Sequence, residues 1–174
     1  MNAHLPPKAE PSNFPLAEVG GRSVLDLDTY IPFLISAIGN KWSRSASALY
    51  LKRFGVGVTE WRIMAMLAIE PGITAYRICQ VIGLDKAATS RALRTLEDRG
   101  LVVSHQEDPQ NHRRTVALTE AGGTLHDAII AVAHAREAIL VSALTRDEVG
   151  QLAALLRRVL RRVPDILPGR EGGR

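Results

Sequence analysis

The sequence contains almost no cysteine. Cys79 is the only one among 174 residues, so no disulfide can form within the chain, and a reducing compartment is favoured. No stretch reaches the roughly 18 consecutive apolar residues that a membrane helix requires. The first residues also lack the basic region followed by an apolar one that is typical of a signal peptide. We therefore expect a soluble, cytoplasmic protein with no membrane partner.

Motifs of the common enzyme classes are also missing. The sequence contains no G-x-S-x-G, Walker, GxGxxG or HExxH pattern, so neither an activated nucleophile nor a nucleotide loop is predicted. His126 and His134 lie eight residues apart rather than four, and no Cys or acidic cluster stands at ligand spacing. We expect no catalytic residues, no cofactor and no metal site.

Charge is close to balance. The chain has 22 basic and 18 acidic side chains, a formal net charge of +4, and 46% hydrophobic residues. This mild basicity permits a nucleic-acid partner without requiring one. The length suffices for one core-bearing domain with additional helices.

The most informative stretch runs from Asp85, which can cap a helix, to Gly100, which can close one. At 100° per residue its apolar and polar positions separate onto opposite faces. The inner face holds Thr89, Ala92, Leu93 and Leu96, and the outer face holds Ala87, Ser90, Arg91 and Arg94. Hydroxyl and guanidinium groups on one helix face can bond phosphates and base edges. This pattern predicts a DNA-recognition helix, with Glu97, Asp98 and Arg99 at its far end making intramolecular pairs.

The flanking segments support this interpretation. Residues 60–70 form an apolar helix pattern behind a capping Thr59, and a short helix follows from Thr74 to Gly83. Three helices in about 40 residues match the spacing of a helix-turn-helix. Residues 101–106 and 113–118 are rich in β-formers around a turn at Pro109, which predicts a hairpin, or wing.

The rest of the chain predicts a fold that is mainly α with a small β-hairpin. Proline and glycine in residues 1–24 favour a flexible N-terminal arm over a segment that docks through Phe14 on a partner subunit. The pattern then divides into an N-terminal helix (25–57, capped by Asp28), the winged region (58–119), C-terminal helices (120–164) and a flexible tail (165–174) that starts once Pro164 ends the last helix.

The long N- and C-terminal helices are amphipathic, and a winged unit of this size cannot cover both. Thr119 is placed to cap the first C-terminal helix, and Thr145 with Glu148 forms a capping box for the second. The simplest burial of their apolar stripes is against a second copy of the chain. A two-fold homodimer would also carry two recognition helices about 34 Å apart, which matches successive major grooves.

Four stretches in this order resemble the MarR family of winged helix-turn-helix regulators. They are residues 58–67, 82–101, the end of the wing at 118–122, and 143–149, and the resemblance extends from about Asp28 to Val163. It implies a homodimer that binds a pseudo-palindromic operator in double-stranded DNA. Such a protein usually represses nearby genes, here of a catabolic or stress operon, until an effector loosens it.

The resemblance also implies DNA-binding residues. Those approaching the major groove would be Lys86, Thr89, Ser90, Arg91 and Arg94, although the helical pattern turns Thr89 partly inward. In the wing, the family's acidic and arginine positions fall on Asp108, Asn111, Arg113 and Arg114, with Asn in place of a second acid. Which of the two arginines enters the minor groove stays open.

An effector cleft is implied where the dimerisation helices meet the winged unit. Aromatic, hydroxyl and guanidinium groups there suit a planar acid, and they are supplied by Asn40, Trp42, Ser43, Arg44, Ser47, Trp61 and Arg62. The expected effector is a small aromatic acid, a phenol or an aromatic acyl-coenzyme A thioester. Trp42 and Trp61 are more readily explained as core or interface aromatics than as ligand contacts.

Two other functions remain open. The first is a redox- or metal-responsive regulator of the same fold. This function is less favoured, because no metal ligands stand at the required spacing and because Cys79 lies beside core positions and is expected to be buried and inert. The chain could also be a non-regulatory module that binds another protein through its long helices.

Overall fold

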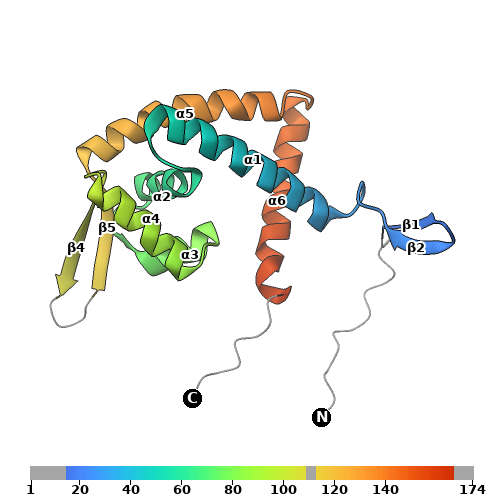
Figure 1. The fold of residues 1–174 in the computed structure, drawn as a ribbon, viewed down its shortest axis with the longest axis horizontal. Helices are drawn as coiled ribbons and strands as arrows, with labels where there is room; N and C mark the ends of the chain where they lie inside the picture. Colours follow the sequence, from blue (N-terminus) through green and yellow to red (C-terminus); the bar gives the residue numbers. More distant parts are fainter. Residues whose placement is uncertain (1–14, 109–112, 167–174) are drawn as a thin grey trace, which may run out of the picture. The chain divides into compact units, whose positions relative to one another are not determined.

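The computed structural model describes residues 15–108 and 113–166 (Figure 1). It is mainly helical and contains the small β-hairpin that the sequence predicts, together with a second antiparallel sheet that was not predicted. Within the described ranges, no helix is long and apolar enough to cross a membrane. The elements are β1 (Leu16–Val19), β2 (Arg22–Leu25), α1 (Ile31–Phe54), α2 (Val58–Ile69), β3 (Ile73–Thr74), α3 (Ala75–Ile82), α4 (Lys86–Asp98), β4 (Val102–Asp108), β5 (Arg113–Leu118), α5 (Glu120–Leu140) and α6 (Arg146–Ile166).

The chain divides into two compact units, residues 1–123 and 124–174. The core of the first unit lies among α2, α3, α4 and a sheet of order β3-β5-β4. Its best-buried aliphatic side chains are Ile63, Met64, Leu67, Ile78 and Leu96. Because they come from three helices at helical spacing, one shared core fixes the mutual position of these helices. The two-residue strand β3, which pairs Ile73 with Val116, is too short to produce a sequence pattern and was not predicted.

Two predicted helix starts are wrong. Asp28 does not cap α1, whose N-cap is Tyr30 with no side-chain hydrogen bond. Instead, the Asp26 carboxylate accepts from the Asp28 N–H and the Thr29 hydroxyl in a turn before the helix. Thr59 does not cap α2, because the helix begins earlier, after Gly57, and Thr59 lies inside its first turn. In neither case does a side chain mark the true start, so composition alone misplaces it.

Part of the predicted flexible arm is ordered. β1 and β2 pair from Leu16 with Leu25 to Val19 with Arg22, around a two-residue turn at Gly20 and Gly21. Both glycines have positive φ, 58° and 73°, as a tight hairpin turn of this kind requires. The prediction of a flexible arm is therefore wrong for the hairpin, while Phe14 and the residues before it lie outside the described part of the chain.

The second unit contains most of α5 and all of α6. The predicted capping box is confirmed, because the Thr145 N–H donates to Glu148 Oε2 at 2.7 Å and the Glu148 N–H donates to Thr145 Oγ1 at 3.3 Å. The Thr145 N–H and hydroxyl both donate to the Glu148 carboxylate, and these two bonds lower the pKa of Glu148. Pro164 does not end α6, which continues to Ile166. Proline keeps a helical φ, and near a helix end it removes only its own N–H bond.

Candidate nucleic-acid interface

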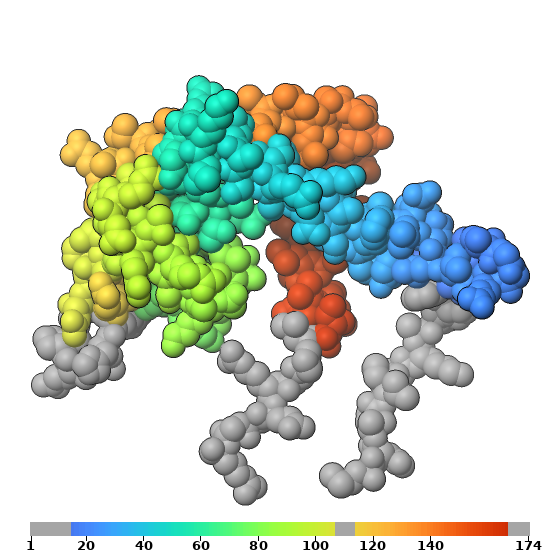
Figure 2. All heavy atoms as spheres, in the orientation of Figure 1, coloured from blue at the N-terminus to red at the C-terminus, as the bar shows by residue number. Residues whose placement is uncertain are grey.

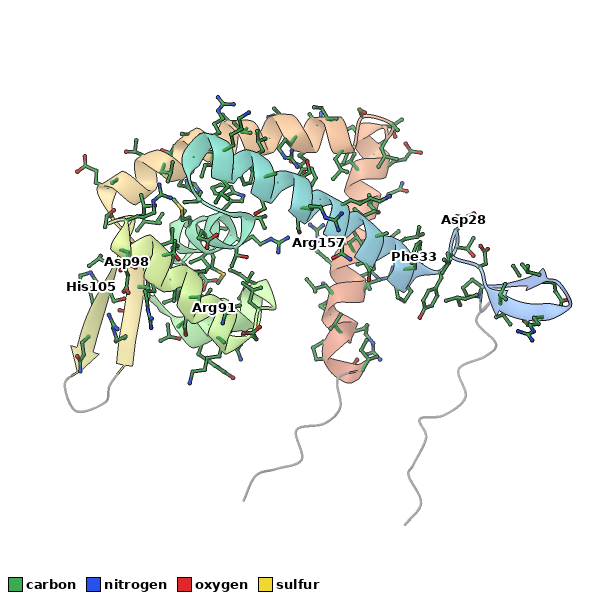
Figure 3. All side chains as sticks on the ribbon, in the orientation of Figure 1. Asp28, Phe33, Arg91, Asp98, His105 and Arg157 are labelled. Atoms are coloured by element: carbon green, nitrogen blue, oxygen red, sulfur yellow. The ribbon has the colours of Figure 1, made fainter. Side chains whose placement is uncertain are left out.

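Helix α4 is built as the recognition-helix prediction requires. The Asp85 carboxylate caps it by accepting from the Ala88 N–H at 2.7 Å. Its inner face, including Ala92, Leu93 and Leu96, is buried in the core of the winged unit. The predicted contacts on the other face are all exposed, namely Lys86, Ser90, Arg91 and Arg94. Figure 3 labels Arg91 on this helix. Burial of one face therefore holds the polar face toward solvent.

Thr89 does not belong to this exposed set. It is completely buried, and its hydroxyl donates to the Asp85 carbonyl at 3.0 Å. The Cys79 thiol donates to the same hydroxyl at 3.1 Å. The prediction that Thr89 approaches DNA is wrong, because its side chain is used to join α4 to α3. Cys79 itself is half-buried rather than fully buried.

The helices before α4 are joined by side chains. Thr74, the predicted start of the short helix, caps α3 by accepting from the Arg77 N–H at 3.2 Å. Arg77 also donates through two nitrogens to the Glu70 carboxylate, at 3.0 and 3.1 Å. These hydrogen bonds lower the pKa of Glu70 and raise that of Arg77. The pair spans the turn from α2 to α3 and so helps to fix the helix-turn-helix.

The predicted wing is present as the β4–β5 ladder. Its register runs from Val102 with Leu118 to Asp108 with Arg113, with an irregularity between Gln106 and Asp108. The tip, residues 109–112 with Asn111, lies outside the described residues, as do the side chains of Asp108 and Arg113. The Arg114 side chain is described and is largely exposed. Figure 2 shows α4 and the wing strands next to each other at the surface of the winged unit.

A hollow of about 260 Å³ lies between α4 and the wing strands. It is lined by Ala75, Ser90, Leu93, Arg94, Glu97, Ser104, Arg114 and Val116. The structure thus brings three predicted DNA contacts, Ser90, Arg94 and Arg114, around one opening. Glu97 Oε1 accepts a hydrogen bond from the Ser104 hydroxyl and lies 3.5 Å from Arg114 Nη2. Pairing by Glu97 was expected, whereas the part played by Ser104 was not.

The far end of α4 is attached to α1 through Arg99. Its guanidinium donates to the carbonyl oxygens of Gly55 at 2.5 Å and Phe54 at 3.2 Å. These carbonyls lie at the C-terminal end of α1, where a basic side chain can satisfy them. A cation at a helix C-terminus also interacts favourably with the helix dipole. The predicted intramolecular role of Arg99 is confirmed, and the bond joins the recognition helix directly to the long N-terminal helix.

The predicted effector residues are only partly brought together. Asn40, Ser43, Arg44 and Ser47 recur at steps of three and four along α1, so they share one side of it. Arg62 Nη2 donates to Ser43 Oγ at 2.9 Å. Ser47 instead lines a second hollow of about 230 Å³, which includes Arg91 and Thr95 of α4.

The two tryptophans of this set are half-buried. The Trp61 ring lies edge-on to the Tyr50 ring, with centroids 6.1 Å apart, and Tyr50 is itself buried. This contact supports the structural explanation of Trp61. In the part of the chain that the structure describes, no cluster of three side chains is arranged to hold a metal ion.

Comparisons with known proteins agree with this architecture. Residues 54–114 match the family model described as the MarR family. A curated relative, the HTH-type transcriptional regulator PetP of Rhodobacter capsulatus, is 35% identical over 75 residues. That match spans 43% of this chain and 45% of the relative, so less than half of the relative's length is covered.

Solved structures match over most of the chain. A MarR/EmrR family transcriptional regulator from Acinetobacter sp. ADP1 superposes with a TM-score of 0.76 at 29% identity, covering 82% of this chain and all of the other. The S. aureus MepR–DNA complex gives a TM-score of 0.66 at 24% identity, covering 78% of this chain and 98% of the other. The second likeness shows a shared fold.

Proposed function

The chain belongs to the MarR family of transcriptional regulators, and from that premise we propose that it binds a pseudo-palindromic DNA operator as a homodimer. The observation that carries this proposal is the division of α4 into a buried apolar face and an exposed face bearing Lys86, Ser90, Arg91 and Arg94. Cations and a hydroxyl on an exposed helix beside a wing are the groups that bond phosphates and base edges.

Each exposed group has a distinct part in this proposal. Lys86, in the first turn of α4, neutralises a phosphate as a point charge, whereas Arg91 and Arg94 can donate in pairs to phosphate or to guanine O6 and N7. Ser90 is short enough to let the helix approach base edges closely. The wing contributes Arg114, and we extend the proposal to Arg113 and Asp108 at the neighbouring positions of the ladder.

Exposed apolar faces support the homodimer. In the first unit, α1 exposes Ile31, Ile35 and Ile38 along one face, at helical steps of four and three, and Phe33 on another face. In the second unit, no residue of α6, all of which the structure describes, is buried, and its exposed apolar side chains are Leu152, Leu155, Leu156, Val159, Leu160, Val163 and Ile166. Continuous apolar stripes of this kind on a single chain are typical of an interface. A second copy supplies an identical stripe and, with it, a second recognition helix.

The proposed switch is repression of a catabolic or stress operon, relieved by a small aromatic acid, phenol or aromatic acyl-coenzyme A thioester. The Ser43–Arg62 pair supports this, since a guanidinium fixed by one hydrogen bond keeps further N–H groups for a carboxylate. If so, an aromatic acid should raise the melting temperature of the wild type, because a ligand of the folded form stabilises it. An Arg62→Met variant should lose that shift, and an equal shift in both would remove Arg62 from the site.

The DNA proposal is tested by Arg94→Ala, with Lys52→Ala as a matched loss of an exposed cation at the end of α1. Titration of a duplex that the wild type prefers, at about 0.15 M salt, should show at least about a fivefold loss for Arg94→Ala, because a good base contact contributes about 1–3 kcal/mol. Lys52→Ala should bind as the wild type does. Equal binding by Arg94→Ala would reject α4 as the recognition helix.

A further inference from the structure

Glu97 carries a charge that is unfavourable for its place on the recognition helix. It follows Ser90 and Arg94 at helical steps of four and three, so the three side chains form one stripe along α4. All three line the hollow between α4 and the wing. On a stripe that faces DNA, a free carboxylate would repel phosphate. In the structure, side chains of the wing offset the charge of Glu97.

Two wing side chains bond the same oxygen of Glu97. Ser104 pairs with Val116 and Gln106 with Arg114 in the β4–β5 ladder, so Ser104 and Arg114 lie diagonally on one face of the wing. Both approach Glu97 Oε1, Ser104 through its hydroxyl and Arg114 through Nη2 at 3.5 Å. The Glu97 side chain is 32% exposed and that of Arg114 is 66% exposed. The carboxylate is therefore partly sheltered, while the guanidinium keeps most of its surface in solvent.

We propose that Glu97 is a positioning residue, which fixes the base of the wing against α4 and aims Arg114 along the same surface as Ser90 and Arg94. This inference rests on the DNA-binding function proposed above. A guanidinium has five N–H donors, so a single bond to Glu97 orients Arg114 and leaves donors for a phosphate or a base edge. Without Glu97, the wing and Arg114 would have more freedom, which must be lost when DNA binds.

The distinguishing consequence is coupling between the helix and the wing. If Arg114 contributes to operator preference only when Glu97 aims it, removing either side chain should have the same effect as removing both. If Glu97 is only an unwelcome charge near DNA, its removal should strengthen binding to every duplex equally. If it only stabilises the fold, its removal should lower the melting temperature and leave operator preference unchanged.

The test is a double-mutant cycle of Glu97→Ala and Arg114→Ala on the full chain. The readout is the ratio of affinities for two duplexes, one enriched by the wild type from a pool randomised over about three helical turns and a scrambled version of it. Each single variant should reduce this ratio about tenfold, and the double variant should reduce it no further. The control is Asp98→Ala, which removes the same charge from the next, exposed residue of α4 (labelled in Figure 3) and should leave the ratio unchanged.

Glu97→Gln gives a second route if Glu97→Ala does not fold. The amide oxygen can still accept from Ser104 and Arg114 but carries no charge, so the ratio should fall less than with alanine and remain coupled to Arg114. Additive effects in the cycle, or an unchanged ratio in both Glu97 variants, would overturn the inference. A wild type that prefers no duplex would instead reject the proposed function, and this inference with it.

Discussion

The substitution Thr89→Val tests whether Thr89 stabilises the fold or contacts DNA. The buried Thr89 hydroxyl donates to the Asp85 carbonyl, which also accepts from the Thr89 N–H at 3.1 Å. Valine keeps the branched shape and that backbone bond, so only one side-chain hydrogen bond, normally worth about 0.5–1.5 kcal/mol, is lost from this carbonyl. The Cys79 thiol loses its acceptor, but it is a weak donor and half-exposed to water.

The expected result is a loss of about 1 kcal/mol in the free energy of unfolding, measured by urea titration at equal protein concentration. Affinity for the wild type's preferred duplex should change by less than about threefold, since no group of the exposed face is altered. Thr89→Ser keeps the hydroxyl but removes a buried methyl group, so it should bind DNA as the wild type does while losing about 1 kcal/mol of stability. Tenfold weaker DNA binding by Thr89→Val with unchanged unfolding would refute the assignment of Thr89 to the interior.

Three further predictions concern the links between elements. Arg99→Met should lower the free energy of unfolding by about 1 kcal/mol, because the last carbonyls of α1 lose their charged donor, and Arg99→Lys should recover part of this in urea titrations. Leu155→Arg should dissociate the proposed dimer in sedimentation, whereas Ile69→Arg, at a more exposed site outside the proposed interface, should not. Glu70 has a lowered pKa in the folded protein, so its stabilising effect is present above the usual glutamate pKa and is lost as the pH falls through the folded value. The difference in urea midpoint between wild type and Glu70→Gln should therefore shrink below about pH 4, and a constant difference would contradict the Arg77 pairing.

The parts of the winged unit that depend on local sequence were predictable. Asp85, Thr74 and Thr119 mark helix starts because each side-chain oxygen reaches an N–H only three residues away. The strands of the wing followed from β-forming residues around a turn. Helices without such a cap were misplaced, since no side chain at Gly57 or Tyr30 makes a capping hydrogen bond.

The sequence contains a signal for the N-terminal hairpin, but a competing signal led to the wrong prediction. Gly20 and Gly21 between short apolar segments are a turn pattern, yet the surrounding prolines suggested an unstructured arm. The wrong placement of Thr89 had a different cause. The helical pattern turned Thr89 inward, and only the family resemblance placed it toward DNA. The structure agrees with the helical pattern, because Thr89 is buried and its hydroxyl accepts from Cys79 of α3.

The contact between the wing and α4 could not be predicted from the sequence. Glu97 and Ser104 are only seven residues apart, but they meet because the chain reverses between α4 and β4. Their contact depends on the register of the wing and on the rotation of α4 about its axis. Both are set by tertiary packing, with Leu96 and Val102 buried on either side of the reversal.

If two copies of α4 bind two half-sites, the duplexes that the protein retains from a randomised pool should share a sequence pattern. Sequencing these duplexes should reveal an inverted repeat whose half-sites are centred about 10 base pairs apart, one helical turn, and the preference for it should be weakened in Arg94→Ala. Retained duplexes without a shared repeat, or the same repeat retained equally by Arg94→Ala, would contradict this prediction.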